Sequence, residues 1–529
     1  MKRHWIIVCI MLTVILGAFP ANANYPHFDA IITGGKVIDG TGNPWYYADV
    51  GIINDRIAVM GNLEGAAAGR CIDATGMVVA PGFIDIHTHA DDDIFDLPLA
   101  ENYIQQGVTT VVGGNCGGSL FPIKEKLAEL EKKNVGINFA LLAGHGTIRE
   151  EVMGMVNRAP TAAELDKMKT LATEAMQSGA FGISTGLYYA PGFYAKTDEV
   201  IELAKVVASY GGIYTTHIRD ESDYNIGLVA AVKEAIEVGE KSRAPVQISH
   251  LKCLGKPVWG KANEILDLIT QARARGVDVT FDQYPYVASG TSLTGAIMPR
   301  WAQEGGQTEL VKRLQDPNIR VKIREEMLAN IERRGGPHTL FIARCSSDPT
   351  LEGKNLKEIG EVKGIAPVDA AIEVQIARGA DIVSFNMQEE DLRLIMQSSY
   401  GMIGSDGSLV EFGEGVPHPR YYGTFPRVLG LYVREKGMLS LEEAVRKMTS
   451  APANRLGLTD RGLLRKGAVA DIVIFDPETV RDLATFEKPH QHPQGIVYVL
   501  LAGHVIVERG KHTGLRAGQV LYHRAQSCQ

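Results

Sequence analysis

The sequence predicts an α/β protein: a TIM-type (β/α)8 barrel with a small composite β-sandwich domain built from both chain ends. Two observations predict this fold. From residue 80 to about residue 406, short apolar runs rich in β-branched residues alternate with longer helical patterns, as in parallel strands joined by helices. Both chain ends instead contain strand-like runs with hairpin turns. A doubly wound open sheet has the same local pattern and is the alternative architecture.

The domain boundaries follow from these patterns. We expect the barrel over residues 81–458 and the β-domain over residues 24–80 and 459–529. The segment at about 289–365 is long for a connection between a strand and a helix, and it contains its own helical stretch near 311–334. Long insertions in barrels tend to cover the site at the carboxyl ends of the strands, so we expect this one to do so.

Eight apolar runs are the predicted barrel strands. They end near Asp85, Gly113, Gly144, Ser184, His217, His250, Phe281 and Ser405. Between them, Thr161 and Glu164 form a capping box that begins a helix reaching Gly179. Residues 197–210, 221–240 and 260–275 have the same helical spacing.

The chain ends contribute the predicted β-domain. Runs at 30–33 and 50–53 precede a hairpin turn at Asn54-Asp55, and the tail has runs at 470–475 and 497–507, the second with a turn at Ala502-Gly503. Each end alone has too few strands to be stable. We therefore expect one domain, interrupted in sequence by the barrel.

Composition narrows the class of protein. The chain of 529 residues has 45% hydrophobic and 22% charged residues, which is typical of a globular protein larger than a single domain. Its formal net charge is −8 and its Lys and Arg residues are scattered, so no nucleic-acid partner is expected. The sequence does not indicate an oligomeric state.

The N-terminus predicts export. Lys2, Arg3 and His4 precede an apolar run at 5–19, and Ala21-Asn22-Ala23 provides small residues at a cleavage site, which together indicate a signal peptide over residues 1–23. We expect a periplasmic or secreted protein with no stable membrane insertion once the signal is removed. A membrane anchor is the alternative, although the apolar run is short for a bilayer span.

The cysteines do not form a disulfide framework. Of the six cysteines, Cys9 lies in the leader, and the rest are an odd and widely spaced set: Cys71, Cys116, Cys253, Cys345 and Cys528. In an oxidising compartment, burial or metal ligation would keep such thiols unpaired.

Candidate metal ligands follow the predicted strand ends. His87 and His89 are two residues apart after the first strand, so both can point to the same side and share one metal. Cys116 follows the second strand, His217 ends the fifth and His250 ends the sixth. Taken singly, each has another explanation: the two histidines as a structural pair, and Cys116 as a small core residue. Their convergence at one barrel face favours a metal site.

Thiolate and imidazole ligands favour zinc over magnesium or calcium. Three protein ligands, Cys116, His217 and His250, leave a position for water, whose pKa zinc lowers toward ~7. Asp406, at the end of the eighth strand, could then accept the proton of that water and pass it to a leaving nitrogen. Its alternative role is that of a helix N-cap, since Ser405-Asp406-Gly407 also has turn chemistry.

Ordered motifs along nearly the whole mature chain resemble one known family. They are 80–85 with His87 and His89, 107–110 leading to 114–117, 184–191, 216–221, 248–252, 282–286, 404–407 and 418–427, with the tail at 467–476. This set is similar to the amidohydrolase superfamily and, within it, to the D-aminoacylases. Hydantoinases and dihydroorotases of the superfamily have a carboxylated lysine near the fourth strand's end, where this sequence has Ser184-Thr185.

The resemblance implies roles for individual residues. It implies a tight Zn²⁺ at Cys116, His217 and His250, and a second, weaker metal at His87 and His89 with Cys116 as the bridge. It makes Asp406 the catalytic acid–base. Further positions match the family's substrate pocket. Tyr189 and Lys252 match the residues that bind the substrate α-carboxylate, and Ser289 and Arg420 match other positions of the pocket. The alternative for Lys252 and Arg420 is solvated surface charge, and only the motif separates Tyr189 from Tyr188.

The activity that the resemblance implies is hydrolysis of an N-acyl-D-amino acid, a small molecule, to a carboxylate and a free D-amino acid. A D-dipeptidase or a cyclic-amide hydrolase using the same metal site is the first alternative. A non-catalytic periplasmic binding protein is a more remote one, because binding does not need an acid–base at the metal. The role of His145, at another strand end, is left open between structure and function.

Overall fold

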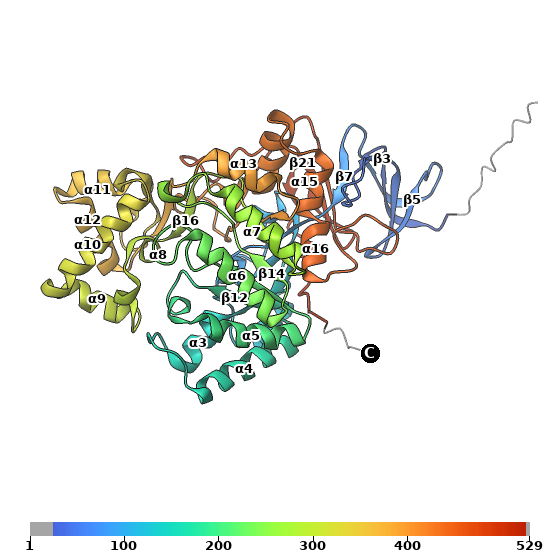
Figure 1. Cartoon of the computed structure of the whole chain (residues 1–529). Helices are drawn as coiled ribbons and strands as arrows, with labels where there is room; N and C mark the ends of the chain where they lie inside the picture. Colours follow the sequence, from blue (N-terminus) through green and yellow to red (C-terminus); the bar gives the residue numbers. More distant parts are fainter. Residues whose placement is uncertain (1–24, 525–529) are drawn as a thin grey trace, which may run out of the picture.

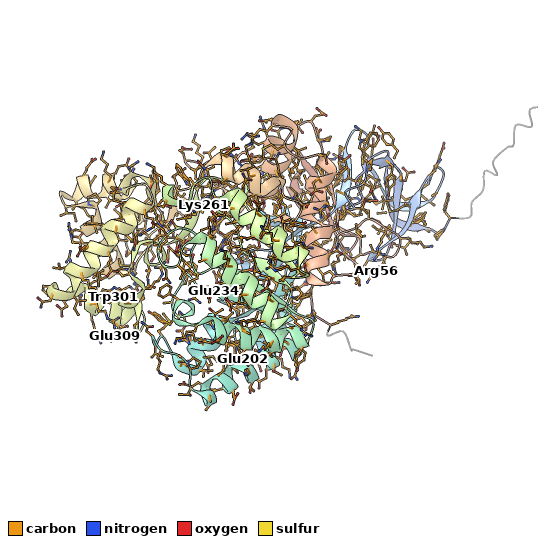
Figure 2. All side chains as sticks on the ribbon, viewed as in Figure 1. Arg56, Glu202, Glu234, Lys261, Trp301 and Glu309 are labelled. Atoms are coloured by element: carbon orange, nitrogen blue, oxygen red, sulfur yellow. The ribbon has the colours of Figure 1, made fainter. Side chains whose placement is uncertain are left out.

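The computed structural model describes residues 25–524, so the expected signal peptide lies outside the described residues. Within that range the chain is a mixture of helices and strands, and the predicted α/β class is confirmed. Figure 1 shows a central body between a sheet region and a helical lobe, which lie on opposite sides of it. In Figure 2, Arg56 marks the sheet region and Trp301 the lobe. No helix among the described residues is both long and apolar enough to cross a bilayer.

Parallel strands form the centre of the molecule. One sheet has the order β10-β9-β8 and a second has the order β11-β12-β13-β14-β15-β19. Their bounds are β8 (Phe83–Asp85), β9 (Val108–Gly113), β10 (Asn138–Leu141), β11 (Ala143–Gly144), β12 (Gly182–Gly186), β13 (Ile213–His217), β14 (Val246–Ile248), β15 (Val279–Gln283) and β19 (Gly401–Ile403). The strand ends agree with the eight predicted positions to within about two residues.

The backbone hydrogen bonds divide the parallel strands into two sheets, although one continuous sheet was expected. The break falls at Leu142, the residue between β10 and β11, whose N–H donates to Gly113 O at 3.0 Å while the next residues pair with β12. At the other junction the backbone beyond β8 meets the backbone beyond β19. Asp406 N donates to His87 O (2.8 Å) and His89 N donates to Gly407 O (2.7 Å).

Amphipathic helices alternate with these strands. They are α2 (Ile123–Lys133), α4 (Ala162–Gln177), α5 (Thr197–Ser209), α6 (Leu228–Ser242), α7 (Ala262–Ala274), α13 (Glu389–Gln397) and α15 (Leu441–Met448). The predicted capping box is formed, because Glu164 N donates to Thr161 Oγ1 and Thr161 N donates to a Glu164 carboxylate oxygen. It satisfies two backbone N–H groups that a helix start otherwise leaves unpaired.

The two chain ends share one sheet. It has the order β23-β22-β21-β20-β7-β2-β3, and β7 (Val78–Pro81) pairs antiparallel with β20 (Ile472–Phe475). The other strands of this sheet are β2 (Lys36–Val37), β3 (Tyr46–Tyr47), β21 (Ile496–Leu501), β22 (His504–Glu508) and β23 (Lys511–His512). A second sheet has the order β5-β4-β1-β6, with β1 (Phe28–Thr33), β4 (Asp49–Ile53), β5 (Arg56–Gly61) and β6 (Ala68–Asp73).

One buried cluster joins the two end sheets. It contains Ile32 and Ile52 from the second sheet with Val79, Ile474 and Leu500 from the first, as in two sheets packed face to face. The exact domain boundaries stay a prediction.

The insertion is larger than predicted. It begins at β16 (Ser289–Ser292), but its sheet, in the order β16-β18-β17, ends with β18 (Asp381–Ser384) rather than near residue 365. The third strand is β17 (Leu340–Arg344), and the helices are α8 (Leu293–Ile297), α9 (Gln307–Gln315), α10 (Pro317–Arg333), α11 (Leu356–Lys363) and α12 (Pro367–Ala377). Its helices form the yellow lobe of Figure 1, which has its own core.

The predicted helical stretch near 311–334 is confirmed, and the structure divides it into two helices, α9 and α10. Asp316 ends α9 and caps α10 by accepting from Asn318 N and Ile319 N. Pro317 is the first residue of α10, a position that suits its missing N–H and fixed φ.

Candidate metal centre and active site

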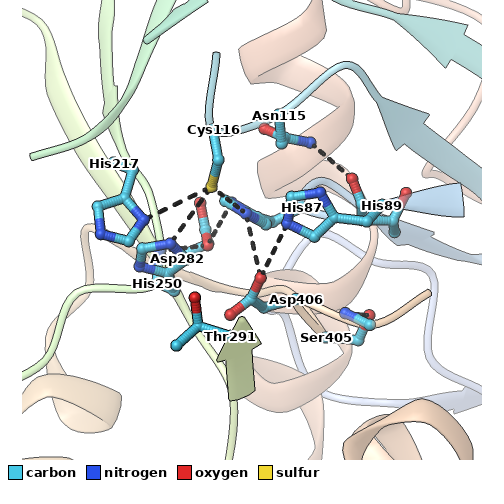
Figure 3. Close-up of polar contacts among 12 residues, drawn as sticks. His87, His89, Asn115, Cys116, His217, His250, Asp282, Thr291, Ser405 and Asp406 are labelled. Carbon is cyan, nitrogen blue, oxygen red and sulfur yellow. Dashed lines mark hydrogen bonds and ion pairs between the residues drawn. The ribbon is translucent and has the colours of Figure 1, made fainter. Parts of the chain in front are cut away.

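The predicted metal ligands come together at one edge of the parallel strands. His87 and His89 follow β8, Cys116 follows β9, His217 ends β13 and His250 lies two residues beyond β14. Because parallel strands present their carboxyl ends on the same side, segments far apart in the sequence meet there. Figure 3 shows the four histidines, Cys116 and Asp406 around a common centre.

The Cys116 thiol lies at the middle of this group. Its Sγ is 3.5 Å from His87 Nε2, 3.7 Å from His217 Nδ1 and 3.5 Å from His250 Nε2. Sulfur and nitrogen ligands of one tetrahedral zinc ion would be about 3.6 Å apart. The spacing and the donor types therefore fit zinc.

Two overlapping ligand sets share the thiol. One set is Cys116, His217 and His250, the other is His87, His89 and Cys116, and the candidate ligand atoms of each set lie within 4.8 Å of one another. Burial raises the pKa of the Cys116 thiol, but the charges of His87 and His250 and hydrogen bonds from the imidazoles outweigh burial, so its pKa lies well below the usual value. A thiolate, the form that binds metals, is favoured.

Asp406 lies beside the second set. Its Oδ1 is 3.5 Å from His87 Nε2 and 3.3 Å from His89 Nε2, and its Oδ2 is 2.9 Å from Arg420 Nη1. Burial raises the pKa of this carboxyl. The charge of Arg420 and the surrounding imidazoles lower it by a larger amount, so the pKa lies well below the usual value. Asp406 is thus ionised at neutral pH and able to accept a proton.

Two carboxylates behind the ligands were not predicted as site residues. Glu221 is buried, with Oε1 3.0 Å from His250 Nδ1 and Oε2 3.6 Å from His217 Nε2. Asp282 accepts from the His250 backbone N–H (2.7 Å), and its Oδ1 is 3.3 Å from His87 Nδ1. Carboxylates in such positions orient metal-binding imidazoles. Two features of the sequence could have identified them: an acidic residue four positions after His217, and another at the end of the seventh strand.

The four predicted substrate residues all line one cavity of about 580 Å³, together with Cys116, His217, His250 and Asp406. The Tyr189 hydroxyl is 3.0 Å from Thr291 Oγ1, and its ring contacts the His217 ring edge-on. Lys252 is buried, and its ammonium group contacts Glu221 and His250 Nδ1. Arg420 pairs with Asp406. Lys252 and Arg420 are therefore not solvated surface charges, and the roles of all four residues stay predictions.

The insertion forms one wall of the cavity. Residues 289–292 of β16 line it, and Ser289 Oγ lies within hydrogen-bond distance, 2.9 Å, of the Asn386 side-chain amide. His145 lies outside the cavity wall. It is fully buried, and its Nε2 is 2.9 Å from Glu199, which also pairs with Arg149, so its observed contacts are structural.

Comparison with known proteins agrees with this geometry. A family model described as "Amidohydrolase family" matches residues 70–507. A D-aminoacylase of Alcaligenes xylosoxydans xylosoxydans is 40% identical over 517 residues, which cover 93% of this chain and 97% of that protein. The chain belongs to the amidohydrolase family. The expected resemblance to the D-aminoacylases is confirmed, and the chain is a hydrolase of amide carbon–nitrogen bonds.

Solved structures of this amidohydrolase's relatives share its fold. The N-acyl-D-glutamate deacylase of Bordetella bronchiseptica, complexed with zinc and a phosphonate inhibitor, has a TM-score of 0.82 at 35% identity, covering 94% of this chain and 100% of that one. A D-aminoacylase structure with a binuclear metal centre has a TM-score of 0.80 at 38% identity, with the same coverage. Both relatives are described with bound metal, which is consistent with a metal cofactor in this amidohydrolase.

Proposed function

We propose that this amidohydrolase uses zinc to hydrolyse the amide bond of N-acyl-D-amino acids, releasing a carboxylate and a free D-amino acid. The observation that carries the proposal is the Cys116 thiol within 3.5–3.7 Å of three imidazole nitrogens, with an ionised Asp406 beside them. The names of the relatives, a D-aminoacylase and an N-acyl-D-glutamate deacylase, support this substrate class.

Cys116, His217 and His250 would hold the tight ion, and His87, His89 and the shared Cys116 thiolate a second, weaker one. A bound zinc ion supplies Lewis-acid polarisation of the scissile carbonyl and lowers the pKa of the attacking water. Asp406 accepts the proton that this water loses as its oxygen bonds to the carbonyl carbon. The same carboxyl then donates the proton to the nitrogen as the carbon–nitrogen bond breaks.

The cavity wall provides the groups that would bind the substrate: Tyr189 and Lys252 for its α-carboxylate, and Ser289 and Arg420 for other parts of it. Lys252 contacts Glu221, and Arg420 contacts Asp406. A substrate group bound by Arg420 would lie beside the acid–base, which brings the reacting amide next to Asp406. A cation and a phenol together are suited to a carboxylate.

We also propose that the two parallel sheets form one closed (β/α)8 barrel. The backbone bonds between 87–89 and 406–407 support closure on one side, and the shared segment 138–144 supports it on the other. A buried cluster that contains Ile84, Val112 and Ala140 together with Ile213 and Met402 supports a common interior for both sheets.

Export is the proposed location, on the strength of the N-terminal sequence alone. The mature enzyme would begin after Ala23 and act in the periplasm or outside the cell. N-terminal sequencing of the protein from a periplasmic fraction tests this proposal. A chain that still starts at Met1 in the cytoplasm contradicts it.

The test of activity uses paired N-acetyl-D and N-acetyl-L forms of Met, Leu, Phe, Glu and Asp with purified zinc-loaded protein. We expect free amino acid from D-forms only. Removal of zinc by a chelator should abolish release, and added zinc should restore it. If the folded, zinc-loaded protein hydrolyses none of the panel, dipeptides and cyclic amides become the substrates to test, and the deacylase proposal is wrong.

A further inference from the structure

The turn that carries Cys116 has an unusual backbone. Cys116 has φ +53, in the left-handed region, between Gly114 at φ +76 and Gly117 at φ +86. Residues with a side chain rarely adopt this conformation, because the Cβ atom then lies too close to the backbone. The surroundings must therefore hold Cys116 in place.

Neighbouring strands leave this turn almost no space. A Cβ atom on Gly114 would lie 2.2 Å from Leu142 O, and one on Gly117 would lie 2.6 Å from Gly186 N. Asn115, between them, donates through Nδ2 to Val112 O (2.9 Å) and to Thr88 O (3.3 Å). The second bond, drawn in Figure 3, connects the turn to the segment between His87 and His89.

A single hydroxyl spans the turn from the β12 side. Ser184 is fully buried, and its Oγ accepts from Gly117 N at 3.1 Å and donates to Gly114 O at 2.5 Å. These two backbone groups flank Cys116. A serine hydroxyl is suited to this place because it donates and accepts at one atom without extra bulk.

We propose that Ser184 is a positioning residue for the metal site: its hydroxyl holds the Cys116 turn in the left-handed conformation, so that the thiol stays between the imidazoles. The inference rests on the proposed metal-binding function. Because both ligand sets share Cys116, a small displacement of its sulfur affects both at once. Without the hydroxyl, the buried N–H of Gly117 loses its partner, and the turn can relax only by moving Cys116.

The experiment compares Ser184→Ala with Thr185→Val. Thr185 is the next residue of β12 and is also buried, but its hydroxyl contacts Thr216 Oγ1 (2.8 Å) and the Tyr214 hydroxyl (3.1 Å) rather than the turn. Two measurements are made on full-length protein: the zinc Kd of the metal-free form, by competition with a chromophoric chelator, and the thiolate-to-metal absorption band of the cobalt-substituted form. Thermal unfolding of the metal-free proteins monitors folding separately.

Ser184→Ala is expected to raise the zinc Kd about 10–100-fold, the usual effect of losing a group that orients a ligand, and to weaken or shift the cobalt–thiolate band. Thr185→Val is expected to leave the band unchanged and the Kd within about twofold, even if its melting temperature falls. If Ser184→Ala does not fold, Ser184→Cys replaces it, because a thiol is a weaker donor and acceptor than a hydroxyl. Its zinc Kd should lie between the wild-type Kd and the Kd expected for Ser184→Ala.

Two outcomes overturn the inference. One is a folded Ser184 variant with the wild-type zinc Kd and cobalt band; the other is an equal loss of affinity in Thr185→Val, which would indicate a general effect of β12. If instead the wild-type protein binds no zinc, the proposed function is wrong, whatever the Ser184 variants do. The failure of each proposal can thus be recognised separately.

Discussion

Asp406 keeps its charge at a place where burial alone would remove it. The carboxyl is only 7% exposed, yet Arg420 and three imidazoles lie near it, and their attraction exceeds the cost of desolvation. The neighbouring Glu221 is buried in the same way, and the charges of Lys252 and the His217 and His250 rings lower its pKa. At the scale of single residues, the site is a set of buried charges that balance one another.

The first prediction concerns the acid–base itself. Asp406→Asn keeps the shape of the side chain but can neither accept nor donate the proton, so kcat should fall about 10²–10⁴-fold. Zinc content, measured on the same samples, should match the wild type if Asp406 is not a required ligand. Turnover within about tenfold of the wild type would contradict the assigned role.

The second prediction concerns Lys447, which is buried and donates to Ser398 O and Gly401 O. Burial lowers its pKa to about 8, below the value of about 10.4 of an unfolded lysine. Between these two values the unfolded chain binds the extra proton, so the contribution of Lys447 to stability increases as pH rises from about 8 to about 10.4.

Lys447→Met removes this titration. Denaturant titration measures the free energy of unfolding of both proteins. As pH rises across that range, the wild type should gain up to about 3 kcal/mol of stability relative to Lys447→Met. The matched control is Lys357→Met at a largely exposed lysine, which reports the general effect of replacing a lysine by methionine. A flat difference for Lys447→Met would show that its pKa is not lowered.

At the scale of elements, the insertion contributes directly to the active site. Its first strand, β16, lies along the cavity, and Thr291 on that strand holds the Tyr189 hydroxyl, which comes from the segment after β12. The position of one predicted substrate-binding group therefore depends on an element that starts about a hundred residues later in the chain.

The third prediction follows from this contact. Thr291→Val removes the hydroxyl that positions Tyr189, so KM for the preferred substrate should rise about 2–10-fold, the range for one lost hydrogen bond, with little change in kcat. Thr294→Val is the control, because its hydroxyl bonds to Gln375 within the insertion, and steady-state kinetics on both variants makes the comparison. Equal effects of the two variants would mean that β16 acts only as a scaffold.

Local patterns in the sequence predicted the strands and most helices, because the spacing of apolar residues and the capping of helices are local properties. The convergence of the candidate metal ligands was predictable for a related reason: each directly follows or ends a β-rich run, and parallel strands bring such positions together. The roles of Glu221 and Asp282 depend on which imidazole faces which carboxylate, and only packing decides that. Likewise, the insertion extends to Ser384 because β18 pairs with β16, a contact that no local period reveals. The division of the helical stretch at Asp316-Pro317 was not predicted, although an Asp-Pro pair is a recognisable helix start.

At the scale of the whole molecule, the C-terminal tail is bonded to the side of the parallel strands opposite the candidate metal centre. Backbone bonds connect Gly518 to Val135, Gln519 and Leu521 to Phe139, and His523 to Gly179, each between 2.8 and 2.9 Å. Leu521 packs on the cluster that contains Ile84 and Met402. The tail thus joins strands that lie far from it in the sequence.

The fourth prediction is that a chain ending at Thr513 is less stable but still active. Losing four backbone bonds and the Leu521 contact should lower the melting temperature by roughly 5 °C, while kcat and KM of the folded protein stay near wild type because the tail does not line the cavity. Differential scanning calorimetry and kinetics at low temperature measure the two effects. Leu515→Ala, an exposed change in the same segment, is the control and should leave the melting temperature unchanged. A large loss of activity in the shortened but folded protein would contradict this separation.

The pairing of β7 with β20 has a consequence for how the protein is made. A ribosome or a translocation pore releases the chain from its first residue onward, so Val78 to Pro81 emerge early and wait for Ile472 to Phe475. During nearly all of synthesis, one edge of this sheet has no partner, and open strand edges invite aggregation. The final packing of the end sheets is therefore a late event, and a nascent chain that stalls before residue 472 exposes an unprotected edge for chaperones to bind or proteases to remove.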